Sequence, residues 1–261
     1  YSKSDLDNIL KNLYSTNFFE NVKINLNNNK LIISLKEYPV INQLILVGEK
    51  KKGNVEQIKK LIQLKERRSF IRSYLAKDID IIKKLYSSLG YNFAEINAKI
   101  KEIDSDNLDL VIEIKRGNQT KISSINFIGN KNIRSKRLRD VIASEEDKFW
   151  KFISKNTNLS ENLINLDKRL LINYYKSVGF YDIEITSNIA QINKLGNADL
   201  VYTIEEGTRY TIKKISTKVD EVFDKQIFFP LNKTFKKYVG EYYSPFKIKK
   251  LLDEMDEIIE E

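Results

Sequence analysis

The chain has 261 residues, of which 41% are hydrophobic and 31% charged, and its formal net charge is +9. This composition is typical of a folded globular protein and excludes a disordered chain. The absence of cysteine and histidine excludes disulfides, thiolate nucleophiles, imidazole-based hydrolase triads and zinc sites built on either side chain. We therefore expect a protein that is not an enzyme and that binds no cofactor, metal ion or small molecule.

The sequence contains no signal for crossing or entering a membrane. No apolar run reaches the roughly 18 residues that a membrane-spanning helix needs. The first residues, Tyr1 to Asp5, lack the basic segment and apolar core of a secretory signal. If the protein is exported, we expect its signal to lie outside this sequence.

Residues 1–39 predict a helix followed by a hairpin. The helix ends in Leu13-Tyr14-Ser15-Thr16-Asn17-Phe18, where Asn17 can adopt the left-handed conformation that closes a helix. Apolar residues then recur at every second position on both sides of the polar turn 27–29, which predicts two strands with one apolar face. We expect this segment to be the C-terminal part of a first module.

Residues 40–117 predict a complete module in the order strand, helix, helix, strand, strand. The first strand ends at Gly48, and the second helix ends in Tyr86-Ser87-Ser88-Leu89-Gly90-Tyr91. Glycine supplies the positive φ that such sharp endings require. A hairpin of alternating apolar residues follows and turns at Asp104-Ser105-Asp106-Asn107.

Residues 118–207 repeat this module. The strand 43–48 returns as Ser124-Ile125-Asn126-Phe127-Ile128-Gly129, and the two glycines are 81 residues apart (129 − 48). The helix ending returns as Tyr175-Lys176-Ser177-Val178-Gly179-Phe180, again followed by an alternating hairpin. Repetition at a fixed period indicates tandem modules.

Residues 208–261 are expected to be the N-terminal part of a fourth module, in an array longer than this chain. Thr211-Ile212-Lys213-Lys214-Ile215 is a weaker copy of the first strand, and a helix follows Ser244-Pro245. The chain as a whole predicts an α+β fold of tandem β-α-α-β-β modules, each a three-stranded mixed sheet with two helices on one face. Because the junctions have almost no spacer, we expect an extended, bent rod.

These repeated signatures resemble the POTRA domain, the polypeptide-transport-associated module of outer-membrane assembly proteins. The resemblance covers the whole chain and departs from the family pattern at Asn17, where glycine is usual, and in the fourth unit, whose first strand lacks Gly-Asn. It implies a location in the periplasm of Gram-negative bacteria, as the soluble part of an outer-membrane protein whose C-terminal β-barrel would be a partner.

The resemblance also implies a function. A POTRA array of this kind is a scaffold that receives unfolded outer-membrane β-barrel proteins and docks accessory lipoproteins, for folding and insertion into the outer membrane. The alternative within the family is the array of a related translocation, assembly or two-partner secretion transporter.

The resemblance places the first strand of each hairpin at a sheet edge. An edge strand exposes N–H and C=O groups, and an extended chain can pair with them by β-augmentation whatever its sequence. The candidate edges are residues 93–101 and 183–192, and we favour the second because it carries no lysine to discourage pairing. The alternative is an ordinary edge without a partner. The predicted protein-binding residues are Ile183, Ile185, Ser187, Ile189, Ala190, Gln191 and Ile192.

An aromatic cluster is the second candidate site. Phe149, Trp150 and Phe152 lie in a segment that is about eight residues longer than its counterpart in the preceding module. These rings are expected to form an apolar patch for clients or neighbours, or alternatively to plug their own module or the joint between modules.

A basic repeat protein that binds nucleic acid is the rival from another class, motivated by a sequence pI of about 9.3. It requires basic residues gathered on one face with interleaved aromatics. Lysine and arginine are instead scattered and mixed with acidic residues along the predicted helices. We therefore expect no nucleic-acid partner.

Overall fold

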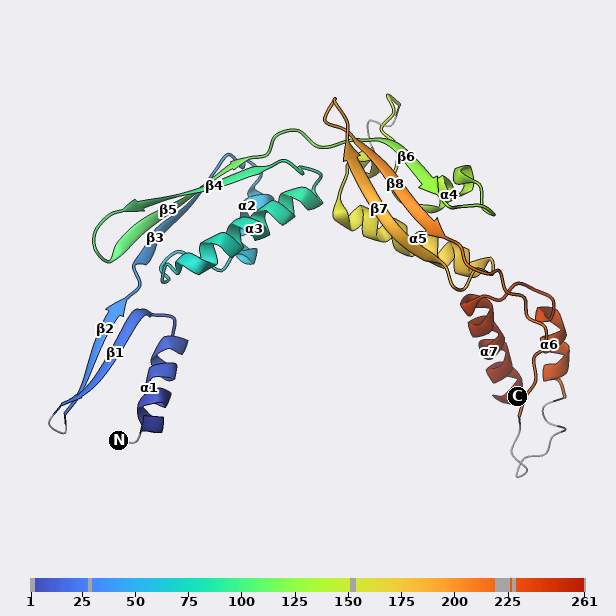
Figure 1. Ribbon diagram of the computed structural model, residues 1–261, viewed down its shortest axis with the longest axis horizontal. Helices are drawn as coiled ribbons and strands as arrows, with labels where there is room; N and C mark the ends of the chain where they lie inside the picture. Colours follow the sequence, from blue (N-terminus) through green and yellow to red (C-terminus); the bar gives the residue numbers. More distant parts are fainter. Residues whose placement is uncertain (1–2, 28–29, 151–153, 219–225, 227–228, 261) are drawn as a thin grey trace. The chain divides into compact units, whose positions relative to one another are not determined.

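A computed structural model describes residues 3–27, 30–150, 154–218, 226 and 229–260. The chain divides into two compact units, Tyr1–Gln119 and Thr120–Glu261. Each unit contains one complete module of a three-stranded sheet and two helices, together with a smaller piece (Figure 1).

The smaller piece of the first unit is a helix and a hairpin. Helix α1 (Lys3–Ser15) contacts β1 (Phe19–Asn27), which pairs antiparallel with β2 (Lys30–Glu37). Asn17 ends the helix with a φ of 58°, the left-handed conformation that the sequence predicts for it. The Tyr14 hydroxyl accepts a 3.1 Å hydrogen bond from the Val22 N–H and so ties the helix to the hairpin.

The complete module of the first unit has a mixed sheet in the order β3-β5-β4. The parallel pair β3–β5 is joined through two helices, as a parallel connection requires, and β4 pairs antiparallel with β5 through a short turn. The helices cover one face of the sheet (Figure 1). Its elements are β3 (Val40–Val47), α2 (Lys52–Leu61), α3 (Arg72–Ser88), β4 (Glu95–Glu102) and β5 (Asn107–Lys115).

Period-two alternation places the core of this module. On the central strand β5, Leu108, Leu110, Ile112 and Ile114 are buried, and their neighbours in sequence are not. They pack against α2 and α3, where the buried side chains include Ile58, Ile82 and Tyr86. Burying each such side chain contributes about 1.5–3 kcal/mol, so the sheet is held to its helices mainly by this face.

The complete module of the second unit has the same topology, in the order β6-β8-β7. β6 pairs parallel with the central strand β8, and β7 pairs antiparallel with it. The α+β class and the three-stranded mixed sheets with helices on one face are therefore confirmed in both modules. The elements are β6 (Ile122–Ile128), α4 (Ser135–Val141), α5 (Glu161–Ser177), β7 (Glu184–Ile192) and β8 (Ala198–Glu205).

Each complete module also buries an aspartate on its second helix. Asp78 on α3 accepts hydrogen bonds from the backbone N–H groups of Gln63 and Leu64, at 2.7 and 2.8 Å. Its counterpart on α5, Asp167, is also fully buried and bonds in the same way to the backbone between α4 and α5. These carboxylates fasten the loop between the two helices, a role that the sequence patterns do not predict.

A second buried pair joins a tyrosine to a glutamate in both modules. Tyr86 donates a 2.5 Å hydrogen bond to Glu49, and Tyr175 donates a 3.0 Å bond to Glu206. Both tyrosines belong to the repeated helix ending, but the glutamates come from different places: one follows β3 and the other follows β8. The modules thus satisfy the same buried hydroxyl with carboxylates from different strands.

The last piece of the second unit contains α6 (Leu231–Tyr238) and α7 (Pro245–Glu260) around its own small core. The predicted first strand 211–215 does not form. Thr211 makes only an isolated bridge with Tyr242. In the complete modules the first strand pairs with the last, and the described residues beyond Thr211 include no strand that could take that part.

Candidate protein-binding edge

The predicted binding strand lies at an edge of its sheet. β7 borders β8 on one side, and within the described residues no strand pairs with its other side. Its structural range is within one residue of the predicted 183–192. The strand therefore presents a row of backbone groups to whatever lies beside it.

A β-bulge interrupts β7 between Ile185 and Ser187. Before the bulge, Ile183 is buried and Ile185 packs against the core. After it, Ile189 pairs with Val201 on the face away from the helices and is 57% exposed. The bulge thus breaks the alternation that the sequence suggests for this strand. Residues that pair with outward-facing positions of β8 are Ser187, Ile189 and Gln191, whereas Asn188, Ala190 and Ile192 pair with buried ones.

The ladder with β8 indicates which backbone groups of β7 face outward. The N–H of Ala198 donates to the Lys121 carbonyl at 2.7 Å, on the β6 side of β8. The pair Ile192–Ala198 is therefore a position without hydrogen bonds between β7 and β8. Such positions alternate with bonded ones in an antiparallel pair. We infer that the N–H and C=O groups of Asn188, Ala190 and Ile192 point away from β8.

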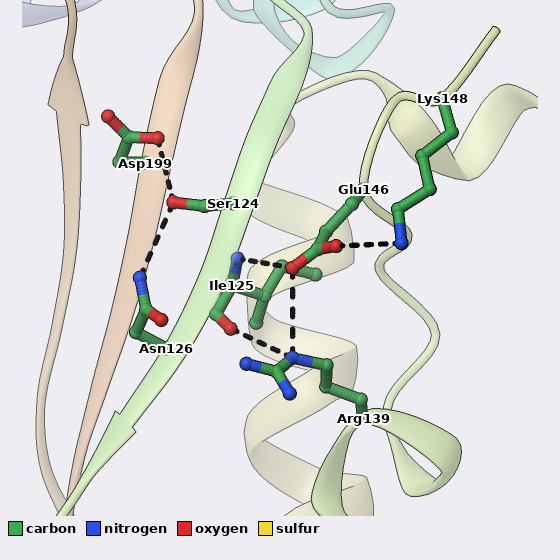
Figure 2. Close-up of polar contacts among 7 residues, drawn as sticks. All are labelled: Ser124, Ile125, Asn126, Arg139, Glu146, Lys148 and Asp199. Atoms are coloured by element: carbon green, nitrogen blue, oxygen red, sulfur yellow. Dashed lines mark hydrogen bonds and ion pairs between the residues drawn. The ribbon is translucent and has the colours of Figure 1, made fainter. Parts of the chain in front are cut away.

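The opposite edge of the same sheet is occupied by the module's own side chains. Figure 2 shows Arg139 and Glu146 beside β6, on the side away from β8. Glu146 accepts a 3.1 Å hydrogen bond from the Ile125 N–H, and Arg139 Nε donates to the Ile125 carbonyl at 3.1 Å. The Asp147 N–H donates to the carbonyl of Ile122 at 2.7 Å. β6 is consequently closed along much of its edge, whereas β7 is open.

The outer strand of the module at residues 40–117, in the first unit, is closed in a similar manner. On β3, the Ile41 N–H donates to the Arg68 carbonyl at 2.9 Å, and the Ile41 carbonyl accepts from the Arg67 N–H at 2.7 Å. Glu66 accepts a 3.1 Å bond from the Leu44 N–H. In both complete modules the parallel outer strand is thus covered and the antiparallel one is left open.

β4 is the other open edge, and it differs from β7 in charge. Its outward face carries Lys99, which forms a 2.6 Å ion pair with Glu113 on β5, and Lys101. Inward or outward lysines on an edge discourage pairing with a further strand. β7 has no lysine, so the preference for β7 over β4 stays a prediction that rests on this difference in charge.

Polar contacts hold the outward face of the β6-β8-β7 sheet. Asp199 on β8 accepts hydrogen bonds from the hydroxyls of Ser124 and Ser123, at 2.7 and 2.8 Å, and Figure 2 shows the first of these. Those hydrogen bonds, led by Ser124, lower the pKa of Asp199 below its ordinary value. The Ser187 hydroxyl donates to Thr203 Oγ1 at 2.9 Å across β7 and β8. Unlike the sheet of the module at residues 40–117, these three strands carry no lysine.

The aromatic cluster lies on the surface. Phe149 is 89% exposed and Trp150 is 58% exposed, with their rings in edge-to-face contact at 4.5 Å. These two rings do not plug their own module. Phe152, the third member of the predicted patch, lies outside the described residues.

A cavity of about 400 Å³ opens in the second unit where the chain leaves β8. Its lining residues are Tyr181, Asp182, Tyr210, Thr211 and Tyr243. The Tyr210 hydroxyl already donates to Asp182 at 2.6 Å. Within the described residues there is neither a cluster of acidic side chains suited to a metal ion nor a helix long and apolar enough to cross a membrane.

Comparison with known families agrees with this geometry. Residues 39–117 and 120–207 match the family model of POTRA, described as "Surface antigen variable number repeat". These two ranges cover more than half of the sequence, and the chain belongs to the POTRA family. Among characterised members, it is similar to the outer membrane protein assembly factor BamA. The recognition of a POTRA array from the repeated signatures is thus confirmed.

Two relatives give the extent of this similarity. The assembly factor BamA of Neisseria meningitidis serogroup B is 26% identical over 216 residues, which cover 81% of this chain and 27% of that protein. BamA of Neorickettsia risticii is 25% identical over 215 residues, covering 82% of this chain and 29% of that protein. The chain therefore spans less than a third of these two relatives. A crystal structure of Haemophilus influenzae BamA POTRA3-5 aligns at 19% identity and a TM-score of 0.42, covering 72% of this chain and 71% of that one.

Proposed function

We propose that this chain is a non-enzymatic scaffold for outer-membrane protein assembly, held in the periplasm as the soluble part of an outer-membrane protein. It binds extended segments of unfolded outer-membrane β-barrel proteins, and accessory lipoproteins, by β-augmentation at β7. The residues concerned are those of the predicted site, from Ile183 to Ile192. The similarity to proteins named as outer membrane protein assembly factors supports the setting.

The observation that carries the proposal is the contrast between the two edges of the β6-β8-β7 sheet. Unpaired backbone groups demand a hydrogen-bonding partner, and an extended polypeptide supplies one whatever its side chains are. β7 offers such groups, and its sheet has no other equally open edge, because Glu146 and Arg139 occupy β6. A receptor that reads the backbone suits clients with many different sequences.

Side chains along β7 are compatible with this role. Beyond the bulge, the outward face carries Ser187, Ile189 and Gln191, which are uncharged. An incoming strand therefore contacts an exposed isoleucine between two polar side chains. Its binding does not require burial of a charged side chain at these three positions. Alternating apolar and polar residues of a client strand would match this pattern.

Photocrosslinking tests the proposal on the whole chain. A crosslinking amino acid at Gln191 would be exposed to an outer-membrane β-barrel protein diluted from urea, in wild type and in two variants of Asn188. Asn188→Pro removes an outward N–H without breaking a bond to β8, whereas Asn188→Ala keeps that N–H. We expect the proline variant to reduce crosslinking about fivefold, the loss of roughly one hydrogen bond, and the alanine variant to match wild type.

Thermal unfolding of both variants controls for damage to the sheet. If crosslinking at Gln191 is absent in wild type, or equal in the proline and alanine variants, β7 does not receive client strands through its backbone.

A further inference from the structure

Glu146 and Arg139 make a compact bridge across the exposed side of β6. Glu146 also lies 3.7 Å from Arg139 Nε and 3.3 Å from Lys148 Nζ, so its carboxylate is held between two cations (Figure 2). Its side chain is only 21% exposed. The carboxylate and the guanidinium together satisfy both the N–H and the C=O of Ile125, as a neighbouring strand would.

Part of this arrangement recurs in the module of residues 40–117. Glu66 accepts from the Leu44 N–H at 3.1 Å and lies 4.0 Å from Lys59 on the last turn of α2. The glutamates are 80 residues apart (146 − 66), the basic residues 80 (139 − 59) and the capped strand residues 81 (125 − 44). These offsets lie within one residue of the 81 between the repeated glycines. The glutamate that caps the strand N–H thus recurs in both modules, whereas among the described contacts only Arg139 also caps the strand carbonyl.

A cap of this kind has a direct physical consequence. A strand that added to β6 would have to displace Glu146 from the Ile125 N–H and separate it from Arg139. The displaced carboxylate would lose its charge-assisted hydrogen bond to the Ile125 N–H and its contact with Arg139, and the guanidinium would lose the Ile125 carbonyl. Addition to β7 displaces no described contact of that kind.

We propose that Glu146 and Arg139 form an edge lock, a pair of specificity-determining residues that denies extended chains the β6 edge and directs them to β7. This inference rests on the proposed function of β7. The module of residues 118–207 then takes up one strand rather than two. The lock also removes the edge through which one copy of the sheet could join another.

Two reporter positions on the whole chain distinguish the edges. A crosslinking amino acid at Asn126 reports on β6, and one at Gln191 reports on β7. The probe is a synthetic ten-residue peptide of alternating valine and threonine. The variants are the double substitution Glu146→Ala with Arg139→Ala, which opens the Ile125 backbone, and Glu146→Gln, whose side-chain oxygen can still accept from the Ile125 N–H.

We expect wild type to crosslink at Gln191 and only weakly at Asn126. Glu146→Gln keeps an acceptor for the Ile125 N–H but loses the charge, so it should gain less at Asn126 than the double variant. The double variant should gain at least about fivefold at Asn126 and keep its signal at Gln191, consistent with the freeing of one or two backbone hydrogen bonds. Faster hydrogen exchange of the Ile125 amide in the double variant would report the opening independently of the peptide.

Failure of the lock and failure of the proposed function give different results. If wild type crosslinks at Gln191 and the double variant gains nothing at Asn126, there is no lock. Equal crosslinking at both positions in wild type also overturns it. If wild type is silent at Gln191, the proposed function of β7 fails; a gain at Asn126 in the double variant would then still support the lock, and silence there too would overturn both.

Discussion

The hydroxyl of Tyr202, on the central strand β8, donates a 2.7 Å hydrogen bond to the buried carboxylate of Asp167 on α5. The same carboxylate accepts from the backbone N–H groups of Ala143 and Ser144, at 2.7 and 3.0 Å. Burial, followed by the nearby charge of Asp167 and this hydrogen bond, raises the pKa of Tyr202. One carboxylate thus joins the sheet, the second helix and the loop between the helices.

Replacing that carboxylate should strongly lower the stability of the module at residues 118–207. Asp167→Ala leaves three donors without their acceptor, which we expect to cost about 3 kcal/mol. Tyr202→Phe removes one donor and leaves the carboxylate two others, so we expect about 1 kcal/mol. Native-state hydrogen exchange of the β8 amides measures both, because it reports on this module alone. Equal losses in the two variants would show that Asp167 does not hold the loop.

The stability of the module at residues 40–117 should depend on pH through Glu49. Burial acts to raise the pKa of this carboxyl, but hydrogen bonds from Asn54, Tyr86 and the Lys51 N–H outweigh it and lower the pKa from 4.5 to about 2. Between these values the unfolded state binds more protons than the folded state, so stability is present above pH 4.5 and is lost as the pH falls towards 2. The full effect is about 3 kcal/mol.

Glu49→Gln provides the comparison for this pH dependence. The variant cannot titrate at this position, so the difference between wild type and variant should narrow as the pH is lowered from 4.5. Hydrogen exchange of the β5 amides across that range measures it. Parallel curves for the two proteins would mean that Glu49 titrates normally in the folded chain.

We expect that no other residue can replace Gly129, because a side chain there would clash with the backbone of β8 and because the residue has a positive φ. It has a φ of 87°, and a Cβ at this position would lie 2.1 Å from the carbonyl oxygen of Ile204. Gly196 has a comparable φ of 77° but open space around it. We expect Gly129→Ala to destabilise the module by more than about 3 kcal/mol and Gly196→Ala by about 1 kcal/mol, the cost of a left-handed alanine alone. Similar melting temperatures would contradict the contact.

The exposed rings of Phe149 and Trp150 should matter for binding and not for stability. Because neither ring is buried, we expect Phe149→Ala with Trp150→Ala to change the free energy of unfolding by less than about 0.5 kcal/mol. If the patch receives clients, the double variant should lower the affinity for an unfolded outer-membrane protein, measured by fluorescence anisotropy. Phe246→Ala, an exposed aromatic residue on α7, is the control. Unchanged affinity would show that the patch does not receive clients.

We expect the lysines on β4 to be what prevents a further strand from pairing with it. Lys99→Thr with Lys101→Thr keeps a good strand-forming residue and removes both charges, at little cost to stability because the Lys99–Glu113 pair is exposed. We expect the double variant to bind the valine–threonine peptide at β4, detected with a crosslinker at Asn97. Lys115→Thr on the central strand is the control. No gain at Asn97 would show that charge is not what excludes a strand there.

Sequence periodicity was sufficient to predict the strands and helices of the two complete modules, and the resemblance to POTRA domains placed residues 183–192 at a sheet edge. It succeeds because one face of β5 and of β8 must lie against helices, so apolar residues occur at every second position of these strands. Asn17, too, could be assigned its left-handed conformation from its place in the repeat. These features depend on local sequence and on one buried face.

Contacts between distant residues could not be predicted in that way. The bulge in β7 leaves no mark in the sequence 183–192, because isoleucine occurs on both sides of it. The caps by Glu66 and Glu146 join residues about 20 positions apart that look like ordinary surface charges. Aligning the two modules with each other would have been the available signal, since both glutamates and both basic partners recur at the repeat spacing. The strand predicted at 211–215 failed because a strand needs a partner, which its own sequence cannot supply.

The bulge at Thr186 sets the length over which β7 can hold another chain. Only residues 187–192 continue a regular ladder to the end of the strand, a span of about 20 Å at 3.3 Å per residue. A strand that crosses a membrane within a barrel needs about 9–11 residues, so the regular part of β7 is shorter than one such strand. Under the proposed function, so short a binding edge would release a client strand once a few hydrogen bonds break.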